Sequence, residues 1–378
     1  MSLDLQQVAQ QLPTGMVAPG NLSASTGSAL VGFIQNGTGA VGRTVQSKLQ
    51  DQNFSIVDFG AIPNGTAYST TGGTDNSAAI NAAIVAANAL ATGTVSTNGL
   101  GVATVYIPDG TWNIANSITQ LPGVSLRFSK NAMLNVTATM SWAITTPLNN
   151  LCEDIGITGG RILCNHLCDG VYLQTIRHYC IDDTMIEDWN FAGWTFGNPS
   201  STTNCYGVSG TPKTHRRFSA PPAGSVALWV RASTDSQIHD VELVGGQTGV
   251  ICQSGGSFMN IHPWARVGPM LVGFNFSGGG AMLTNCYADS ANQIGFTMTG
   301  TNYTITSPLV FNGTSSTSAP DNTMIAIQFN TVNPQSTVTG LIANGLASSN
   351  RIAQDIKTAD STFTGLTVLG TTTNNVVT

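Results

Sequence analysis

The sequence has little charge of either sign. Lys, Arg, Asp and Glu make up 8% of its 378 residues, against about 25% in an ordinary soluble domain. The net charge of −6 argues against nucleic acid as a partner, because binding to phosphates requires clustered Lys and Arg. The densest basic run, KTHRRF at 213–218, is short, and we expect it to form a solvated loop.

Long apolar runs are also missing. No run approaches the roughly 18 residues of a transmembrane helix, so we expect no membrane insertion. The segment MSLDLQQVAQQL at 1–12 has neither a basic start nor an apolar core, which predicts no signal peptide. Seven irregularly spaced cysteines without a CxxC pair indicate buried reduced thiols rather than disulfides or a zinc site. We therefore expect assembly in a reducing cytoplasm, without a metal or other cofactor.

Aromatic residues are scarce at 7%, whereas Gly, with 42 residues, is abundant alongside Ser, Thr and Asn. Disorder is not expected, because disordered chains are usually poor in apolar residues and rich in charge. Low charge combined with many β-branched and hydroxyl residues favours a largely β architecture. Its surface would be covered by neutral polar side chains.

A new structural segment begins at residue 55. The 54 residues before it differ from it in composition. SIVDFGAIPNGT at 55–66 predicts a short apolar strand followed by a turn. TDNSAAINAAIVAANALATG at 74–93 predicts a helix over 76–91 that Gly93 ends. The candidate N-caps are Thr74, Asp75 and Ser77, and the apolar face comprises Ile80, Ala83, Ile84 and Ala87.

A weak repeat follows from about residue 150. Six segments begin with a small residue followed by apolar ones, and their starts lie 22 to 24 residues apart except for one gap of 34. These segments are GVYL at 170, GWTF at 193, ALWV at 227, GVIC at 249, GFNF at 273 and GFTM at 295. A second strand series lies between them, at 180–188, 237–243, 258–264 and 282–288.

This period is typical of a β-solenoid, in which each coil buries its apolar side against the next. The alternative, a β-sandwich, has turns about every 8 to 12 residues and no longer period. We therefore predict an all-β solenoid. The Ala-faced helix would cover its first coil, since an uncovered sheet edge invites aggregation.

Three segments carry a resemblance to a known family. VDFGA (57–61), TDNSAAINAAIVAA (74–87) and ATVYIPDGTWNI (103–114) resemble the opening of the pectate-lyase-superfamily parallel β-helix found in bacteriophage tailspikes and tail fibres. Residues 27–51 resemble the connector that precedes this fold in many tail proteins. The chain departs from the family at Pro63-Asn64-Gly65, where the family has Gly-Asp-Gly.

The resemblance implies a right-handed, single-stranded parallel β-helix over 55–350, with its cap at 55–92. Residues 1–54 would be a tail-attachment connector, and residues 351–378 a β-rich end of the solenoid. It also implies a homotrimer in the virion tail, bound to a tail or baseplate protein through 1–54, that recognises bacterial capsule or lipopolysaccharide. These motifs are architectural, so depolymerisation of that glycan and non-catalytic adhesion both stay open.

Candidate site residues come from aligning the second strand series. Its common Asp/Asn position, at Asp183, Asp240, Asn260 and Asn285, predicts a stacked polar ladder at a turn. Residues two and four positions further along would share one strand face. Candidate catalytic acids there are Glu242, Asp289 and Glu187, and candidate glycan-binding residues are Trp264, His262 and Tyr287.

An alternative explains the same residues without function. Pro263 would pack His262 and Trp264 into a turn, and the acids would be solvated, as would the cluster Asp182, Asp183, Glu187 and Asp188. For an active enzyme, the sequence favours a glycoside hydrolase over a lyase. A lyase would require a Lys, Arg or Tyr base beside an acidic sugar, and the coils hold few basic residues.

Overall fold

The structure, a computed structural model, describes residues 31–34, 38, 40–45, 54–93, 103–202, 205–311, 325–329, 335–344, 351–355, 362–365 and 367–369. The chain divides into two compact units, residues 1–54 and 55–378. In the first unit, β1 (Gly32–Phe33) pairs antiparallel with β2 (Arg43–Thr44). The proposed attachment role of this unit stays a prediction.

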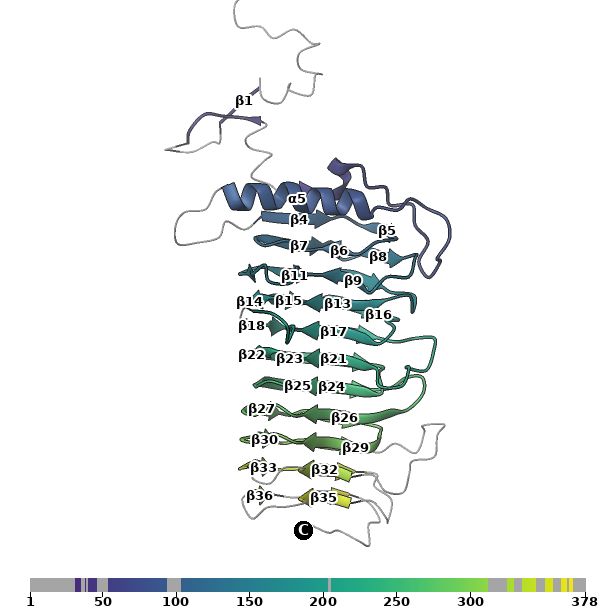
Figure 1. The fold of residues 1–378 in the computed structure, drawn as a ribbon, viewed down its shortest axis with the longest axis vertical. Coiled ribbons are helices and arrows are strands. Elements are labelled where there is room, and N and C mark those ends of the chain that lie inside the picture. Colours follow the sequence, from purple (N-terminus) through teal and green to yellow (C-terminus); the bar gives the residue numbers. More distant parts are fainter. Residues whose placement is uncertain are drawn as a thin grey trace, which may run out of the picture. The chain divides into compact units, whose positions relative to one another are not determined.

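The second unit is a right-handed parallel β-helix, as predicted. Its strands stack in columns below helix α5, Ser77–Gly93 (Figure 1). One column is a 10-stranded parallel sheet. Its strands are β6 (Ile118–Thr119), β9 (Trp142–Thr145), β13 (Asp169–Leu173), β17 (Ala192–Phe196), β21 (Val226–Val230), β24 (Thr248–Cys252), β26 (Met270–Phe276), β29 (Ala291–Met298), β32 (Ile325–Phe329) and β35 (Arg351–Asp355).

The largest sheet has 17 strands and forms the other main wall. The first five coils each contribute two strands to it, one before and one after a turn, and each later coil contributes one. It includes β4 (Ala103–Ile107), β5 (Gly110–Ile114), β7 (Val124–Phe128), β8 (Ala132–Val136), β11 (Gly156–Thr158), β12 (Arg161–Leu163), β15 (Cys180–Asp182), β16 (Met185–Glu187), β19 (Ser209–Gly210), β20 (Lys213–His215), β23 (Ser236–Val244), β25 (Gly256–Trp264), β27 (Ala281–Thr284), β30 (Thr304–Thr306), β33 (Thr337–Thr339) and β36 (Thr362–Thr364). Another short strand, β3 (Phe54–Ser55), stands where the two units meet in sequence.

Two four-stranded sheets complete the coils. The first comprises β10 (Cys152–Glu153), β14 (Ile176–Arg177), β18 (Cys205–Tyr206) and β22 (Ser233–Thr234). The second comprises β28 (Tyr287–Asp289), β31 (Leu309–Phe311), β34 (Ile342–Asn344) and β37 (Thr367–Leu369).

The repeat found in the sequence is the register of the 10-stranded sheet. The second residue of each repeat is aligned with the second residue of the next repeat. The series begins with Val171 paired with Trp194 and ends with Phe274 paired with Phe296. The small first residue of each repeat faces the opposite wall: a Cβ on Gly249 would lie 2.3 Å from Pro263 Cβ. Close approach of the two walls therefore explains why each repeat begins with Gly or Ala.

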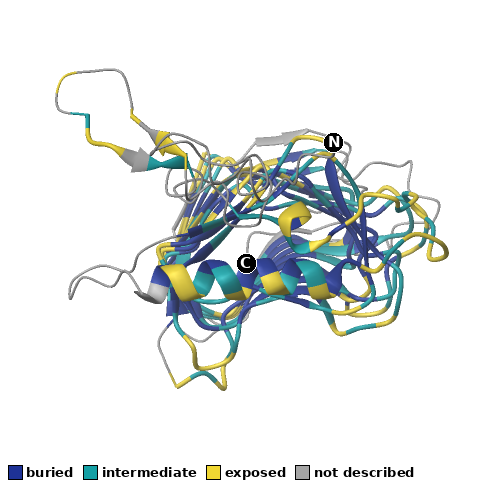
Figure 2. Cartoon of the chain, turned by 90° about the horizontal axis from the view of Figure 1, so that it is seen from above, coloured by how far each residue is buried: buried dark blue, intermediate teal, exposed yellow. Residues whose placement is uncertain are grey.

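Helix α5 (Ser77–Gly93) covers the first coil, and Figure 2 shows it lying across the stack. Its buried side chains include all four predicted apolar residues, each 0% exposed. Asp75 Oδ1 accepts from Ser77 N at 2.9 Å and begins the helix. Asn81 bonds to the backbone of Ser117 and Thr119, which fixes the helix to the coil below. A short 3-10 helix, η1 (Ile56–Phe59), precedes it.

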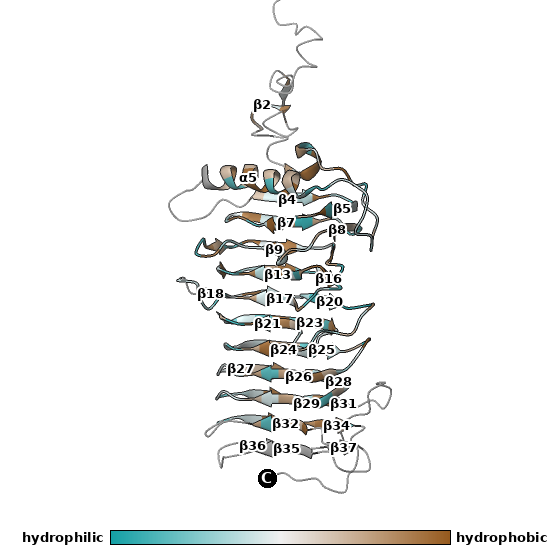
Figure 3. Cartoon of the chain, turned by 45° about the vertical axis from the view of Figure 1, so that its right-hand side comes forward, coloured by the Kyte–Doolittle hydropathy of each residue, from teal (hydrophilic) through white to brown (hydrophobic). Residues whose placement is uncertain are grey.

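The core consists of inward-facing residues stacked from coil to coil. Phe274 and Phe296, for example, stack with ring centroids 4.6 Å apart. Hydrophobic and hydrophilic residues alternate along many strands (Figure 3), as expected where one face is buried. In the described part of the chain, no helix is long and apolar enough to cross a membrane.

All seven cysteines are free, and six are buried. Burial raises the pKa of Cys152, Cys252 and Cys286 to about 12. The prediction of buried, reduced thiols is confirmed for six residues and wrong for Cys180, which is exposed. Cys180 occupies an outward position of β15, where only the central residue points into the core.

Candidate functional site

The predicted ladder is confirmed, because each of its Asp and Asn residues lies in a turn. Asp183, Asp240, Asn260 and Asn285 have φ angles of 51°, 53°, 54° and 51°, which is the left-handed region that Asn and Asp tolerate better than most residues. Asn260 Nδ2 also donates to Asp240 Oδ1 at 2.6 Å, one coil away. The turn bends each coil and points the following strand along a common outer face.

That outer face carries five of the six predicted site residues on three consecutive coils. Glu242 is aligned with His262, and Val244 with Trp264, in the pairing of β23 with β25. The next coil supplies β28. We call the five residues the acid–aromatic stripe: Glu242, His262, Trp264, Tyr287 and Asp289.

Trp264 and Glu242 form the first contact within the stripe. The indole Nε1 of Trp264 donates to Glu242 Oε1 at 2.6 Å. Glu242 is exposed, and Trp264 is half-buried. The bond orients an aromatic side chain whose apolar surface is partly open to solvent.

His262, Tyr287 and Asp289 form the second contact. The rings of His262 and Tyr287 stack with centroids 4.5 Å apart and an interplanar angle of 13°. His262 Nε2 lies 3.1 Å from Asp289 Oδ2, and Ser290 Oγ donates to Asp289 Oδ1 at 2.8 Å. The three side chains are half-buried, so the cluster is ordered yet accessible from outside.

These contacts shift two pKa values in opposite directions. Burial would raise the pKa of Asp289, but hydrogen bonds from His262, Ser290 and Tyr287 stabilise the carboxylate and hold the pKa below its ordinary value. Burial, followed by the charge of Asp289 and the hydrogen bond to it, raises the pKa of Tyr287 to about 12. At neutral pH Asp289 is therefore ionised and Tyr287 is a hydrogen-bond donor.

Glu187, the sixth predicted residue, lies apart from the stripe. Its side chain is 0% exposed. Arg161 donates to both carboxylate oxygens at 2.7 and 2.6 Å, Arg217 Nη2 donates at 2.9 Å, and the Tyr68 hydroxyl donates at 2.9 Å. This carboxylate joins three segments of the chain and has no exposed surface of its own, so it lies apart from the acid–aromatic stripe.

Two expectations from the sequence about solvated charges are wrong. Glu187 and Asp188 are buried at 0% and 1% exposure. The basic run at 213–218 is not a solvated loop, because it begins with strand β20 and continues into Arg216, which is 3% exposed. Pairing of Glu187 with His215 on the next coil brings the acidic and basic runs together.

Two loops cover this part of the outer face. Asn135 Nδ2 donates to Ser69 O at 2.8 Å, and Asn113 Nδ2 donates to Gly72 O at 2.6 Å, which fixes the loop that precedes α5. The Tyr68 ring meets Phe218 from the second loop edge to face at 5.4 Å. A groove of about 700 Å³ remains beside them. Its charged lining comprises Lys130, Arg161, Asp182, Asp183, Glu187 and Arg217.

Sequence reasoning missed Tyr68, Arg161 and Arg217. A usable signal was present for the two arginines, because each lies 26 to 30 residues from Glu187, which is about one coil. Tyr68 gave no such signal, since its loop precedes the repeat. Among the described residues, no group of three or more His, Cys, Asp or Glu side chains could hold a metal ion.

No family model and no curated protein matches the chain. Solved structures do match it. A mutant of the tailspike protein of E. coli bacteriophage HK620, in complex with a hexasaccharide, superposes with a TM-score of 0.67 at 14% identity, covering 94% of this chain and 68% of that chain. The A-module of mannuronan C-5 epimerase AlgE6 from Azotobacter vinelandii gives a TM-score of 0.56 at 11% identity, covering 84% and 99%.

The Streptococcus pneumoniae surface protein and adhesin PfbA gives a TM-score of 0.53 at 13% identity, covering 86% of this chain and 99% of that chain. At these identities the similarity concerns the fold alone. The fold of this chain is thus the parallel β-helix shared by a phage tailspike, an epimerase module and a bacterial adhesin, which confirms the fold that the resemblance implied.

Proposed function

We propose that this chain is a bacteriophage tailspike whose β-helix binds a bacterial surface polysaccharide, either capsule or lipopolysaccharide, along the acid–aromatic stripe. The observation that carries the proposal is the joining of two aromatic rings, a histidine and two carboxylates on one outward face. The structural similarity to a tailspike that was solved with a hexasaccharide supports the class of ligand.

The chemistry of the stripe suits a sugar polymer. The faces of Trp264 and Tyr287 offer apolar surface for the C–H groups of sugar rings, while their polar edges remain hydrogen-bonded. Glu242 and Asp289 can accept from sugar hydroxyls. Because coils repeat every 4.8 Å or so, a glycan lying along the helix axis would meet all three coils of the stripe.

The separation of Glu242 and Asp289 favours hydrolysis of the bound glycan. Glu242 and Asp289 lie on coils to either side of the Trp264 coil and are offset by two residues along the strand direction, so their backbones are roughly 12 Å apart, and side chains that lean toward each other bring the carboxyl groups closer. Carboxyl groups about 6.5 to 9.5 Å apart are typical of inverting glycoside hydrolases. Asp289, held ionised, would activate water, and Glu242 would protonate the leaving oxygen.

A tailspike-type adhesin without catalysis is the second candidate. It is favoured by the hydrogen bond from Trp264 to Glu242, because this bond already occupies an oxygen of the carboxyl group that hydrolysis would require as a proton donor. In that case the stripe would bind the glycan and leave it intact.

One experiment separates these candidates. Purified protein is incubated with capsule or lipopolysaccharide from sensitive cells, and new reducing ends and unsaturated products are measured. Hydrolysis predicts reducing ends without unsaturation, and a loss of about 100-fold or more in Glu242→Gln and Asp289→Asn. Asp182→Asn, an exposed acid of the same sheet outside the stripe, is the matched control and should keep full activity. Binding with no chain shortening would leave the adhesin.

Assembly is the remaining part of the proposal. We propose a homotrimer that is built in the host cytoplasm and joined to the phage tail or baseplate through residues 1–54. Exposed Met259 and Met282, 41% and 55% accessible on neighbouring coils, offer apolar surface that a neighbouring subunit would cover. Light scattering should give three times the chain mass, and deletion of residues 1–54 should abolish attachment to tails while leaving the trimer. A stable monomer would contradict the trimer.

A further inference from the structure

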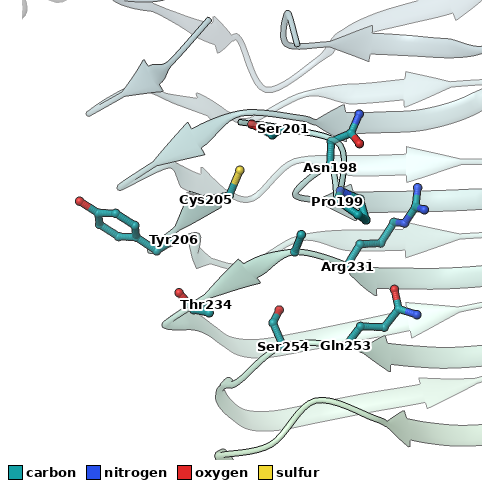
Figure 4. Close-up of a pocket in the computed structure, with 10 residues that line it drawn as sticks. Asn198, Pro199, Ser201, Cys205, Tyr206, Arg231, Thr234, Gln253 and Ser254 are labelled. Carbon is teal, nitrogen blue, oxygen red and sulfur yellow. The ribbon is translucent and has the colours of Figure 1, made fainter. Parts of the chain in front are cut away.

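A second pocket lies away from the acid–aromatic stripe, where the turns after the 10-stranded sheet lead into the four-stranded sheet of β18 and β22 (Figure 4). Its volume is about 540 Å³. Turns that follow β17, β21 and β24 each contribute to its wall, so three consecutive coils build it. Its lining includes Asn198, Ser201, Tyr206, Arg231, Thr234 and Gln253.

Arg231 is the one permanently charged side chain in this lining. Its guanidinium carbon lies over the Trp229 ring, 4.7 Å from the ring centroid, which is a cation–π contact. Arg231 Nε is buried and has no hydrogen-bond partner among the described residues. Tyr172 is hydrogen-bonded to the Arg231 side chain, and no ion pair with Arg231 occurs in the described part of the chain, so no carboxylate neutralises the positive charge in the pocket wall.

Gln253 adds a second donor beside this charge. Its Oε1 accepts from Trp229 Nε1 at 3.2 Å, which directs the remaining amide group, Nε2, away from the indole as a donor. Figure 4 shows Arg231 and Gln253 at one end of the pocket and Tyr206 at the other. Asp235 is absent from this lining, but it lines a neighbouring pocket that shares Thr234 with this one.

The lining contains a guanidinium, two amides, hydroxyls and an aromatic ring but no carboxylate. A guanidinium recognises carboxylates with paired hydrogen bonds. Aromatic rings and neutral polar groups are the usual partners of a sugar ring and its hydroxyls. Repulsion from a fixed acid, which would exclude an anionic sugar, is absent from the lining.

We propose that this pocket is a second saccharide site, specific for a sugar that bears a carboxylate, with Arg231 binding the carboxylate and Gln253 an adjacent oxygen. Tyr206 closes the far end and contacts the sugar that follows. The site shares no residue with the acid–aromatic stripe, so the two proposals stand or fail separately. A protein with both sites would hold a mixed neutral and acidic polysaccharide on two faces of the β-helix.

The test compares two trisaccharides of the same linkage, one of hexuronate and one of the neutral hexose, by isothermal titration calorimetry with the full chain. The hexuronate should bind about tenfold more tightly, and its advantage should shrink as NaCl is raised. Arg231→Gln should remove that advantage, and Arg231→Lys should keep part of it, because lysine retains the charge but not the planar fork.

Gln253→Glu provides a variant of nearly unchanged shape. Its new carboxylate can still accept from Trp229 but pairs with Arg231, so hexuronate binding should fall by about tenfold or more while thermal unfolding is unchanged. Arg266→Gln, an exposed arginine outside the pocket, is the matched control and should bind as the wild type does.

Three results would overturn the proposal. Equal affinity for the two trisaccharides would remove the role of the carboxylate, and unchanged hexuronate binding in Arg231→Gln and Gln253→Glu would place the ligand elsewhere. Competition by inorganic sulfate at the same concentration as the trisaccharide would make the pocket a plain anion site. Glycan binding at the stripe is tested by Trp264 variants, which should leave hexuronate binding here unchanged.

Discussion

Trp264 and Glu242, one coil apart, are joined by a hydrogen bond of 2.6 Å from the indole N–H to the carboxylate. The bond restricts an aromatic side chain that would otherwise lose rotational freedom on binding, and such restriction before binding favours affinity. The same carboxylate is thereby fixed beside the ring. An acceptor for sugar hydroxyls and an apolar platform are thus presented as one unit.

Two substitutions separate the ring from its hydrogen bond. Trp264→Ala removes both and should lower glycan affinity by about tenfold or more, since a truncated aromatic anchor typically costs upwards of about 1 kcal/mol. Trp264→Phe keeps an apolar ring but frees Glu242, so its loss should be smaller. Calorimetric titration of both variants with the host glycan checks the order, and equal losses would show that the ring face contributes nothing.

The pKa of Asp289 predicts how stability depends on pH. Its folded value lies below the ordinary value, which is about 3.9 in an unfolded chain. The carboxylate therefore stabilises the fold above that pH, and this contribution disappears as the pH falls through the folded pKa. Denaturant unfolding at neutral pH and near pH 2 should show a smaller loss in Asp289→Asn than in the wild type. An equal loss in both would contradict the assignment.

Glu187 should matter for stability rather than for glycan binding. Removing one partner of a buried ion pair typically costs about 3 to 5 kcal/mol, because the other charges lose their compensation. Glu187→Ala leaves Arg161 and Arg217 together without their acid, and its free energy of unfolding should fall by about that amount. Urea unfolding measures the change. Asp182→Asn, an exposed neighbour in sequence, is the control, and a loss no larger than that of the control would contradict the prediction.

The turn ladder gives a prediction about backbone conformation. Asn285 has a φ of 51°, which glycine adopts freely and β-branched residues avoid. Asn285→Gly should therefore change the free energy of unfolding little, whereas Asn285→Val should lower it by about 1 to 2 kcal/mol. Thermal and urea unfolding of the pair check the order. Two variants of equal stability would contradict this account of the ladder.

The fold could be predicted because its signals are local or periodic. The helix is marked by its caps and by Ile80 and Ile84 at helical spacing, and the coils are marked by a small residue every 22 to 24 positions. The reason for that small residue, contact between the two walls at positions such as Gly249 and Pro263, explains why the period survives in a sequence with few other constraints.

The arrangement of the candidate site was predicted in part for the same reason. Alignment of the turn residues placed Glu242, His262, Trp264, Tyr287 and Asp289 on one face, because the coil repeats its register. Glu187 occupies an equivalent position after its turn residue, but loops from outside the repeat cover its side chain. Tyr68 and the pocket at Arg231 also depend on turns and loops, whose positions follow from tertiary contacts and not from the period of the coils.

The most direct test of the central claim is a binding measurement on an array of bacterial capsules and lipopolysaccharides. Wild-type protein is compared with a double variant, Trp264→Ala with Tyr287→Ala, after both are shown to have the same far-UV spectrum and oligomeric state. The wild type should bind one or more of these glycans, and the double variant should lose this binding. A wild type that binds no surface glycan, or a double variant that binds as the wild type does, would contradict the claim.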